Sequence, residues 1–221
     1  MKNINVIFFD MDGVLFNSEE IWHPLENEYL NKLTGNWSKE DMENVIGMHI
    51  KDIHEYIKQK FNIKLTFRDL DEKYLEMANF VYGKGVELFP GVMEFIKKIK
   101  KEHKVFLVSS STRKWIDIAS KRFEFNKCFD EIISGDDVYG KGKPLPDIYN
   151  LALDKANVSA NEAVAIEDSY NGIISAKRAG IFTVGFYNGY NKMKTVKQAH
   201  IVIDSFENID FIKEMINEKI R

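Results

Sequence analysis

The sequence predicts an α/β fold built on a doubly wound parallel sheet. Short apolar runs rich in β-branched residues recur along the chain, each bounded by polar or turn residues and too short for a helix. These runs are Val6–Phe9, Val105–Val108, Ile132–Ile133, Val164–Ile166, Thr183–Phe186 and Ile201–Ile203. Helical patterns separate them, as in Val92–Ile99, where apolar residues recur at intervals of three and four. Because strands alternate with helices, we expect buried parallel strands in a Rossmann-like core.

Residues 17–83 break this alternation, because they contain helical patterns and no convincing strand. The helical spacing is clearest in Ile53–Ile57 and Leu70–Leu75. We therefore expect residues 1–16 and 84–221 to form the core. The inserted segment is expected to form a helical cap, hinged over the open end of the sheet.

The start of this segment carries two opposing signals. Asn17 followed three residues later by Glu20 suits a capped helix start. Pro24 lies in the same stretch and predicts a kink or a later start.

The amino-acid composition limits which binding partners the protein can have and which cellular compartment it suits. The chain has 31 Lys and Arg against 34 Asp and Glu, so it lacks the basic excess that binds nucleic acid or an anionic membrane. Cys128 is the single cysteine, which excludes an internal disulfide and indicates a reducing compartment. The apolar run that ends at Phe9 is too short for a signal peptide or a membrane span, so we expect a cytoplasmic protein. No heptad pattern indicates an oligomeric state.

Polar residues follow the predicted strands. In open α/β sheets ligands bind outside the carboxyl ends of the strands, so these residues are expected to converge on one edge. They are Asp10, Asp12 and Gly13 after the first strand, Ser109 and Ser110 after the second, Asp136, Asp137 and Lys143 beyond the third, and Glu167 and Asp168 after the fourth. Asp136 and Asp137 are also typical of a surface loop.

Carboxylates gathered this closely would raise one another's pKa unless a cation neutralised them. Mg²⁺ is the simplest such cation, because it takes oxygen ligands and commonly binds carboxylates together with a substrate phosphate. Hydroxyl and lysine donors beside it suit a phosphate dianion. The pattern therefore suits a phosphate group on the substrate.

Four motifs carry a resemblance to a known family. They are Asp10-Met11-Asp12-Gly13-Val14-Leu15, Ser109 after its strand, Lys143-Pro144-Leu145-Pro146-Asp147, and Glu167-Asp168 followed by Asn171-Gly172 and Ala179-Gly180. In order and spacing they resemble the haloacid dehalogenase superfamily, and most closely its β-phosphoglucomutase-like phosphatases. The resemblance spans nearly the whole chain.

The resemblance implies a role for each motif residue. Asp10 would be the nucleophile that forms an aspartyl-phosphate, and Asp12 the general acid and then the base. Ser109 would hydrogen-bond the transferring phosphoryl group, and Lys143 would neutralise it and hold Asp10.

The remaining motif positions would bind metal and substrate. Mg²⁺ would be held by Asp10, Asp168 and the Asp12 carbonyl, with Glu167 steadying the waters of the metal. Gly13 and Ser110 are expected to contact the substrate.

Three other functions compete with a phosphatase. A phosphomutase uses the same aspartyl-phosphate, but such mutases typically add a basic residue after the glycine that matches Gly47, and here Met48-His49-Ile50-Lys51 contains no arginine. A dehalogenase needs neither Asp12 nor Asp168. A non-catalytic binding protein on the same fold would not need all the catalytic positions filled. In the inserted segment Trp22, His23, His49 and Lys51 are candidate substrate contacts, although lone residues of these types are more often packing residues.

Overall fold

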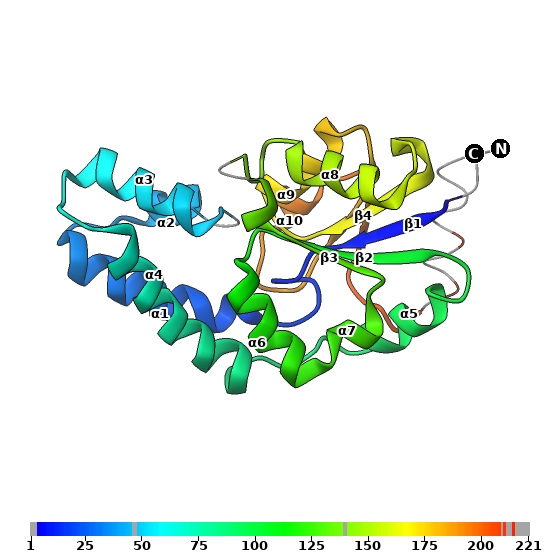
Figure 1. The fold of residues 1–221 in the computed structure, drawn as a ribbon, viewed down its shortest axis with the longest axis horizontal. Helices are drawn as coiled ribbons and strands as arrows, with labels where there is room; N and C mark the ends of the chain where they lie inside the picture. Colours follow the sequence, from blue (N-terminus) through cyan, green and yellow to red (C-terminus); the bar gives the residue numbers. More distant parts are fainter. Residues whose placement is uncertain (1–3, 46–47, 139–140, 209, 211–213, 215–221) are drawn as a thin grey trace.

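The core of the protein is a six-stranded parallel sheet (Figure 1). The computed structural model describes residues 4–45, 48–138, 141–208, 210 and 214. The strands are β1 (Val6–Phe9), β2 (Lys104–Ser109), β3 (Glu131–Ser134), β4 (Ala163–Glu167), β5 (Phe182–Phe186) and β6 (Ile201–Ile203). Their order is β3-β2-β1-β4-β5-β6, and every pairing is parallel. This arrangement confirms the predicted doubly wound α/β fold, with the chain reversing its direction of growth at β1.

Helices cover both faces of the sheet (Figure 1). On one face lie α5 (Val92–Ile99), α6 (Arg113–Phe123) and α7 (Phe125–Cys128), and on the other α8 (Asp147–Ala156), α9 (Tyr170–Arg178) and α10 (Met193–Val196). Two short 3-10 helices, Gly135–Val138 and Ala160–Glu162, lie in the connections around α8.

The two helical layers divide the side chains of each strand between them. Ile7 and Phe9 of β1 belong to one buried apolar cluster, which includes Phe95 of α5. Val6 and Phe8 belong to a second cluster on the other side of the sheet. The alternation follows from strand geometry, in which successive side chains point to opposite faces. Because both faces are buried, β1 reads as a continuous apolar run.

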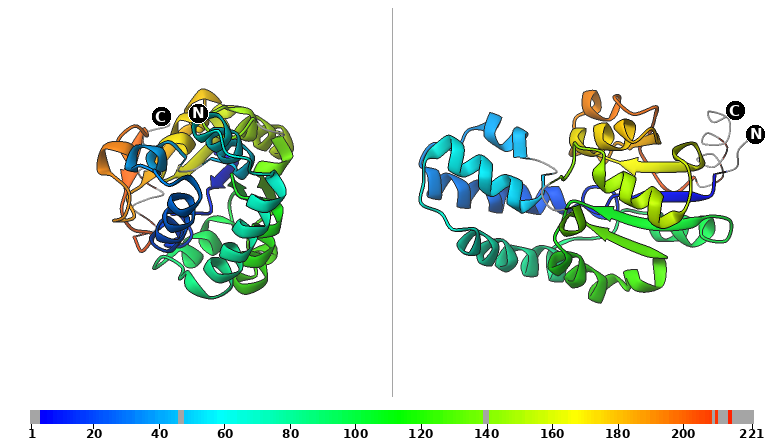
Figure 2. Two further views of the ribbon diagram at one scale, coloured as in Figure 1. Left: turned by 90° about the vertical axis from the view of Figure 1, so that its left-hand side faces the viewer. Right: turned by 45° about the horizontal axis from the view of Figure 1, so that its top comes forward.

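The inserted segment is helical, as predicted. It contains α1 (Ser18–Thr34), α2 (Lys39–Val45), α3 (Ile50–Phe61) and α4 (Phe67–Phe80), followed by a turn of π-helix at Val81–Gly85. Figures 1 and 2 show these helices beyond the carboxyl ends of the strands, so they face the edge where the polar residues gather.

The start of α1 differs from the prediction in two respects. The helix begins at Ser18 and contains Pro24, so the late start was wrong. Asn17 occupies the position before the helix, but its side chain does not cap the helix. It instead donates from Nδ2 to Glu20 Oε2 at 3.1 Å and accepts at Oδ1 from the Glu87 N–H at 3.0 Å. Asn17 therefore ties the entry of the inserted segment to its exit.

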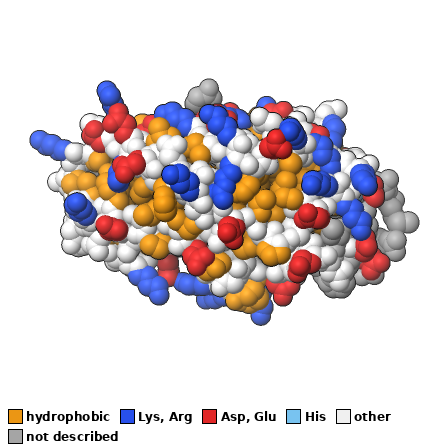
Figure 3. Space-filling model, turned by 90° about the horizontal axis from the view of Figure 1, so that it is seen from below, with side chains coloured by type: hydrophobic (Ala, Val, Ile, Leu, Met, Phe, Trp, Pro, Cys, Tyr) orange, Lys and Arg blue, Asp and Glu red, His pale blue; other side chains and the backbone are white. Residues whose placement is uncertain are grey.

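The surface carries charges of both signs. On the face in Figure 3, basic and acidic side chains are interspersed among hydrophobic ones. Phe80 and Tyr190 are among the large hydrophobic side chains exposed to solvent. Among the helices that the structure describes, none is both long enough and apolar enough for a membrane span.

Replacing Phe95 by Ala should destabilise the core. Phe95 is fully buried and packs against Phe9 and Phe206, with ring centroids 6.0 and 5.4 Å away. We expect Phe95→Ala to lower the free energy of unfolding by about 3–5 kcal/mol, measured by urea denaturation. Phe80→Ala is the control, because this ring is 54% exposed and its loss should change stability by at most about 0.5 kcal/mol. Equal effects of the two substitutions would contradict this packing.

Candidate active site

Three buried carboxylates meet at the carboxyl edge of the sheet. Asp10 follows β1, Glu167 ends β4, and Asp168 comes next in the chain. Because β1 and β4 are neighbours, each of these residues places a carboxylate oxygen within 4.8 Å of the other two. Burial is the main cause that raises the pKa of Glu167 to about 7. Burial also raises the pKa of Asp168 above its usual range, and the Asp10 charge raises both values further. The cluster therefore requires positive charge.

Lys143 supplies part of that charge. Its Nζ donates to Asp10 Oδ1 at 2.7 Å and to the Val108 carbonyl at 3.1 Å, and it lies 2.6 Å from Glu167 Oε1. The Lys143 side chain is only 2% exposed. Burial alone would lower the pKa of this ammonium, but the two carboxylates outweigh burial and raise it. Lys143 therefore stays charged.

One carboxylate oxygen of Glu167 is hydrogen-bonded, and the other has no partner among the described residues. The Tyr149 hydroxyl donates to Glu167 Oε1 at 2.5 Å. Glu167 Oε2 is buried and has no hydrogen-bond partner among the described residues. A Cβ at Gly172 would lie 1.9 Å from this oxygen, so glycine is required there for the carboxylate to fit. A buried carboxylate oxygen without a donor suits a cation or a cation-bound water.

Asp12 is held by two hydroxyls. Tyr82 Oη donates to Asp12 Oδ1 at 2.7 Å, and Ser111 Oγ donates to Oδ2 at 2.8 Å. Trp22 Nε1 donates in turn to Tyr82 Oη at 2.9 Å, which links helix α1 to Asp12. Burial first, and then the Asp10 charge, raise the pKa of Asp12 to about 6. A fixed carboxyl with such a pKa can hold or release a proton near neutral pH.

Gly13 lies against the carboxylate cluster and outside the pocket lining. Its φ of +72° favours glycine, and a Cβ there would come within 2.1 Å of Asp168 Oδ2. Asn188, which follows β5, donates from Nδ2 to the Gly13 carbonyl at 2.9 Å and to Asp168 Oδ2 at 3.1 Å. Gly13 thus allows the loop after β1 to approach Asp168.

A pocket opens above the carboxylates. From the core it is lined by Asp10, Asp12, Ser109, Ser110, Lys143 and Asp168, among others. Ser109 Oγ accepts from the Ser111 N–H at 3.1 Å, and Ser110 Oγ is buried without a partner among the described residues. The inserted segment lines the opposite wall with side chains that include Glu19, Trp22, Glu26 and Tyr74. The pocket lies between the core and the inserted segment, so a small ligand bound there would contact both.

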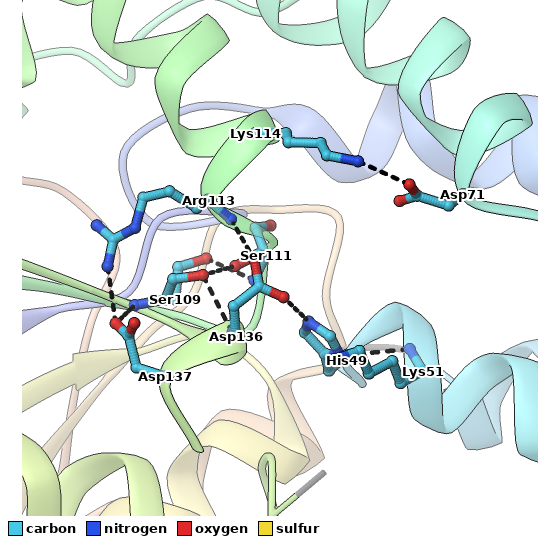
Figure 4. Close-up of polar contacts among 10 residues, drawn as sticks. His49, Lys51, Asp71, Ser109, Ser111, Arg113, Lys114, Asp136 and Asp137 are labelled. Atoms are coloured by element: carbon cyan, nitrogen blue, oxygen red, sulfur yellow. Dashed lines mark hydrogen bonds and ion pairs between the residues drawn. The ribbon is translucent and has the colours of Figure 1, made fainter. Parts of the chain in front are cut away.

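Polar contacts connect the inserted segment to the core beside this pocket (Figure 4). His49 Nε2, at the start of α3, lies 3.1 Å from Asp136 Oδ1, and Asp136 Oδ2 accepts from the Arg113 N–H at 2.8 Å. Lys114 of α6 pairs with Asp71 of α4 at 2.8 Å. His49 is therefore engaged with the core, and it does not line the pocket. Gly47, which bears on the mutase alternative, lies outside the described residues.

The two aspartates after β3 lie in the 3-10 helix Gly135–Val138, outside the carboxylate cluster. Asp137 is exposed, as a surface loop predicts, and accepts from the Arg113 guanidinium at 2.7 Å. Asp136 is only partly exposed and belongs to the contact with His49. Neither carboxylate joins the cluster of Asp10, Glu167 and Asp168.

Several residues that complete the site were not singled out from the sequence. They are Glu19, Glu26, Tyr82, Trp115, Tyr149 and Asn188. Asn188 follows β5. It could have been found by the same rule as the other residues, namely that ligands bind outside the carboxyl ends of parallel strands. Asp147 is the last residue of the motif that contains Lys143, and Tyr149 lies two positions after it. Tyr149 is one of the buried residues of α8.

The parallel sheet, the carboxylate cluster at its carboxyl edge and the pocket above it define an α/β enzyme. The model of the haloacid dehalogenase-like hydrolase family matches residues 7–186, and the chain therefore belongs to this family. The resemblance seen in the four motifs is confirmed.

Relatives of known structure or name agree with this family. The chain is 28% identical to the phosphorylated carbohydrates phosphatase of Thermotoga maritima, over 96% of this chain and all of that protein. It is 26% identical to the pyrophosphatase PpaX of Bacillus thuringiensis, over 81% of this chain and 82% of that protein. Its fold is similar to CbbY of Rhodobacter sphaeroides, with a TM-score of 0.79 and 27% identity over 93% of this chain and 96% of that one.

Replacing Lys143 by Met should strongly destabilise the fold. The substitution leaves two buried carboxylates without their cation, which typically costs about 3–5 kcal/mol. Lys114→Met is the matched control, because that lysine is 60% exposed and its surface ion pair contributes at most about 1 kcal/mol. Urea denaturation in chelator measures both. If Lys143→Met were no more costly than Lys114→Met, Lys143 would not neutralise the cluster.

Proposed function

We propose that the protein is a Mg²⁺-dependent phosphatase that hydrolyses a small phosphorylated metabolite through an aspartyl-phosphate on Asp10. The observation that carries the proposal is the position of Asp10. Asp10 follows β1, and its carboxylate lines the pocket and accepts a hydrogen bond from Lys143 Nζ at 2.7 Å. A carboxylate held this way can attack a phosphorus atom in the pocket.

Asp12 is proposed as the proton carrier. As the bond between phosphorus and the leaving oxygen breaks, protonated Asp12 would give its proton to that oxygen. Asp12 would then take a proton from the water that attacks the aspartyl-phosphate, so the proton balance closes over the two steps. The hydroxyls of Tyr82 and Ser111 support this role, because they hold both carboxyl oxygens in place.

The phosphoryl oxygens need compensation during transfer. Ser109 and Ser110 line the pocket at the end of β2 and are proposed to donate to these oxygens. The Lys143 ammonium, which is bonded to Asp10, would add positive charge beside the phosphoryl group. Gly13 would contribute by letting the loop after β1 lie close to Asp168, a role that differs from the direct substrate contact expected from the sequence.

The residues present fit Mg²⁺. The carboxylates of Asp10 and Asp168, with the Asp12 carbonyl, are proposed as its protein ligands, and the unpaired Oε2 of Glu167 suits a water of the metal. When bound, Mg²⁺ would neutralise charge on the transferring group and orient it toward Asp10.

The segment 17–83 is proposed to act as a cap over the core formed by 1–16 and 84–221. It supplies one wall of the pocket and contacts the core through His49 and Lys114. A cap of this kind excludes water during transfer and selects the substrate.

The relatives do not share one substrate. Their names refer to phosphorylated carbohydrates and to a pyrophosphatase, and a second structure of CbbY, 26% identical to this chain, holds xylulose-(1,5)bisphosphate. A phosphatase is favoured over a mutase here, because neither His49 nor Lys51 lines the pocket, and His49 Nε2 lies 3.1 Å from Asp136 Oδ1.

Replacing Asp10 by Asn should abolish turnover, because an amide cannot form the acyl-phosphate. We expect kcat for phenyl phosphate to fall by about a thousandfold or more. Asp154→Asn is the control, because Asp154 is exposed on α8 and does not line the pocket. Phosphate release measures the effect, and circular dichroism checks the fold. Retention of more than a tenth of the activity would exclude Asp10 as the nucleophile, because removing a nucleophile costs far more than about tenfold.

Activity should require Mg²⁺. Excess chelator should stop phosphate release and Mg²⁺ should restore it, whereas Ca²⁺ should inhibit because it tolerates looser coordination. Calorimetry should detect Mg²⁺ binding that Asp168→Asn weakens by about tenfold or more and Asp154→Asn leaves unchanged. Full activity in chelator would contradict the metal site.

A further inference from the structure

His49 joins the inserted segment to the core through a buried contact. It immediately precedes α3, and its side chain is only 2% exposed. Its Nδ1 accepts from the Lys51 N–H at 3.3 Å, so the hydrogen of the neutral ring lies on Nε2, which donates to Asp136 Oδ1 at 3.1 Å. Burial lowers the pKa of His49 and outweighs the Asp136 charge, so the ring is neutral at pH 7. One ring nitrogen therefore caps α3, and the other bonds to the core.

Asp136 connects His49 to the end of β2. Residues 109–111, the serine loop, lie there. The Asp136 N–H donates to Ser134 Oγ at 3.2 Å, and Ser134 Oγ donates to the Ser111 carbonyl at 2.8 Å. The Gly135 N–H donates to the same carbonyl at 3.2 Å. Figure 4 shows Asp136 between His49 and the serine loop. A shift of Asp136 would therefore displace the backbone of this loop.

A steric contact joins His49 to the same loop. A Cβ at Gly135 would lie 2.4 Å from the Ser110 carbonyl oxygen and 2.5 Å from His49 Cδ2. The imidazole and the serine loop therefore both pack against this glycine, and a side chain there would have to displace one of them. Close packing of this kind transmits a displacement from one group to the next. The imidazole thus restrains the Ser110 backbone through Gly135 as well as through Asp136.

The serine loop in turn holds two groups of the proposed reaction. The Ser111 N–H donates to Ser109 Oγ at 3.1 Å, so the Ser109 hydroxyl keeps its own hydrogen for an oxygen in the pocket. Ser111 Oγ donates to Asp12 Oδ2 at 2.8 Å. Electrostatic stabilisation of a transferring group depends on donors that are fixed before the reaction. The orientation of both Ser109 and Asp12 therefore depends on this loop.

We propose that His49 is a positioning residue, which fixes the serine loop for phosphoryl transfer when the inserted segment lies against the core. His49 acts through Asp136 and Gly135 and touches no reacting group, because it does not line the pocket. This inference rests on the proposed phosphatase function, because the serine loop is the one proposed to hold the phosphoryl oxygens.

Two substitutions separate the tasks of the two ring nitrogens. His49→Asn keeps an acceptor for the Lys51 N–H, since asparagine is a favoured helix cap, but its amide is too short to reach Asp136. His49→Gln can place an amide N–H where Nε2 lies and so restores the donor to Asp136. We expect kcat/KM for phenyl phosphate to fall by about fivefold or more in His49→Asn, because a small misplacement of Ser109 weakens transfer. His49→Gln should stay within about twofold of the parent protein.

Two further variants show whether the contact itself carries the effect. Asp136→Asn disturbs the same contact from the core side, and the double variant with His49→Asn should lose no more activity than either single variant. Lys114→Met is the control for docking alone, because it breaks an exposed ion pair between the core and Asp71 of the inserted segment. Its kcat/KM should stay within about twofold of the parent protein.

Hydrogen exchange, followed by NMR, tests the link to the loop without any turnover. The amide hydrogens of Gly135 and Ser111 should exchange about threefold faster or more in His49→Asn, and His49→Gln should restore the parent rates. Parent-like kcat/KM in His49→Asn, equal losses in the Asn and Gln variants, or unchanged exchange would each overturn the inference. If the parent protein releases no phosphate from phenyl phosphate with Mg²⁺, the proposed phosphatase is refuted, and the exchange rates still decide whether His49 fixes the loop.

Discussion

The contact of Lys143 with Asp10 and Glu167 is the interaction on which the site depends. The sheet order places β1 beside β4, and this pairing brings Asp10, Glu167 and Asp168 within 4.8 Å of one another. Buried carboxylates at such separations repel, and burial itself penalises their charge. The Lys143 ammonium compensates part of this repulsion, while Glu167 Oε2 has no hydrogen-bond partner among the described residues. The fold therefore leaves the buried carboxylates with an excess of negative charge, which a bound cation would neutralise.

A second constraint comes from the two connections of the inserted segment. Tyr82 lies at its exit and binds Asp12, while Trp22 of α1 binds Tyr82. The proposed proton carrier therefore contacts the segment that would cap the pocket. Asn17 joins the entry and the exit through the Glu87 N–H. These hydrogen bonds link the placement of the inserted segment to the orientation of Asp12, which supports the proposal that the reaction proceeds with the pocket covered.

Much of the fold and the charged cluster could be predicted, because the signals are local. Each strand is an apolar run, and a parallel sheet brings the residues after its strands to one edge. The helical walls could not be predicted, because their contacts join residues far apart in sequence. Tyr82 and Asp12 are 70 residues apart, Tyr74 and Glu26 48, and His49 and Asp136 87. An amphipathic pattern identifies a buried helix face without identifying its partner.

The most direct test of the account is a crystal structure grown with Mg²⁺ and beryllium fluoride, which mimics an acyl-phosphate. The account predicts a fluoride complex on the Asp10 carboxylate, with Ser109 and Lys143 within hydrogen-bond distance of its fluorines. It also predicts Mg²⁺ bound by Asp10 and Asp168. A fluoride complex on another residue, or a bound complex without Mg²⁺, would contradict the central claim.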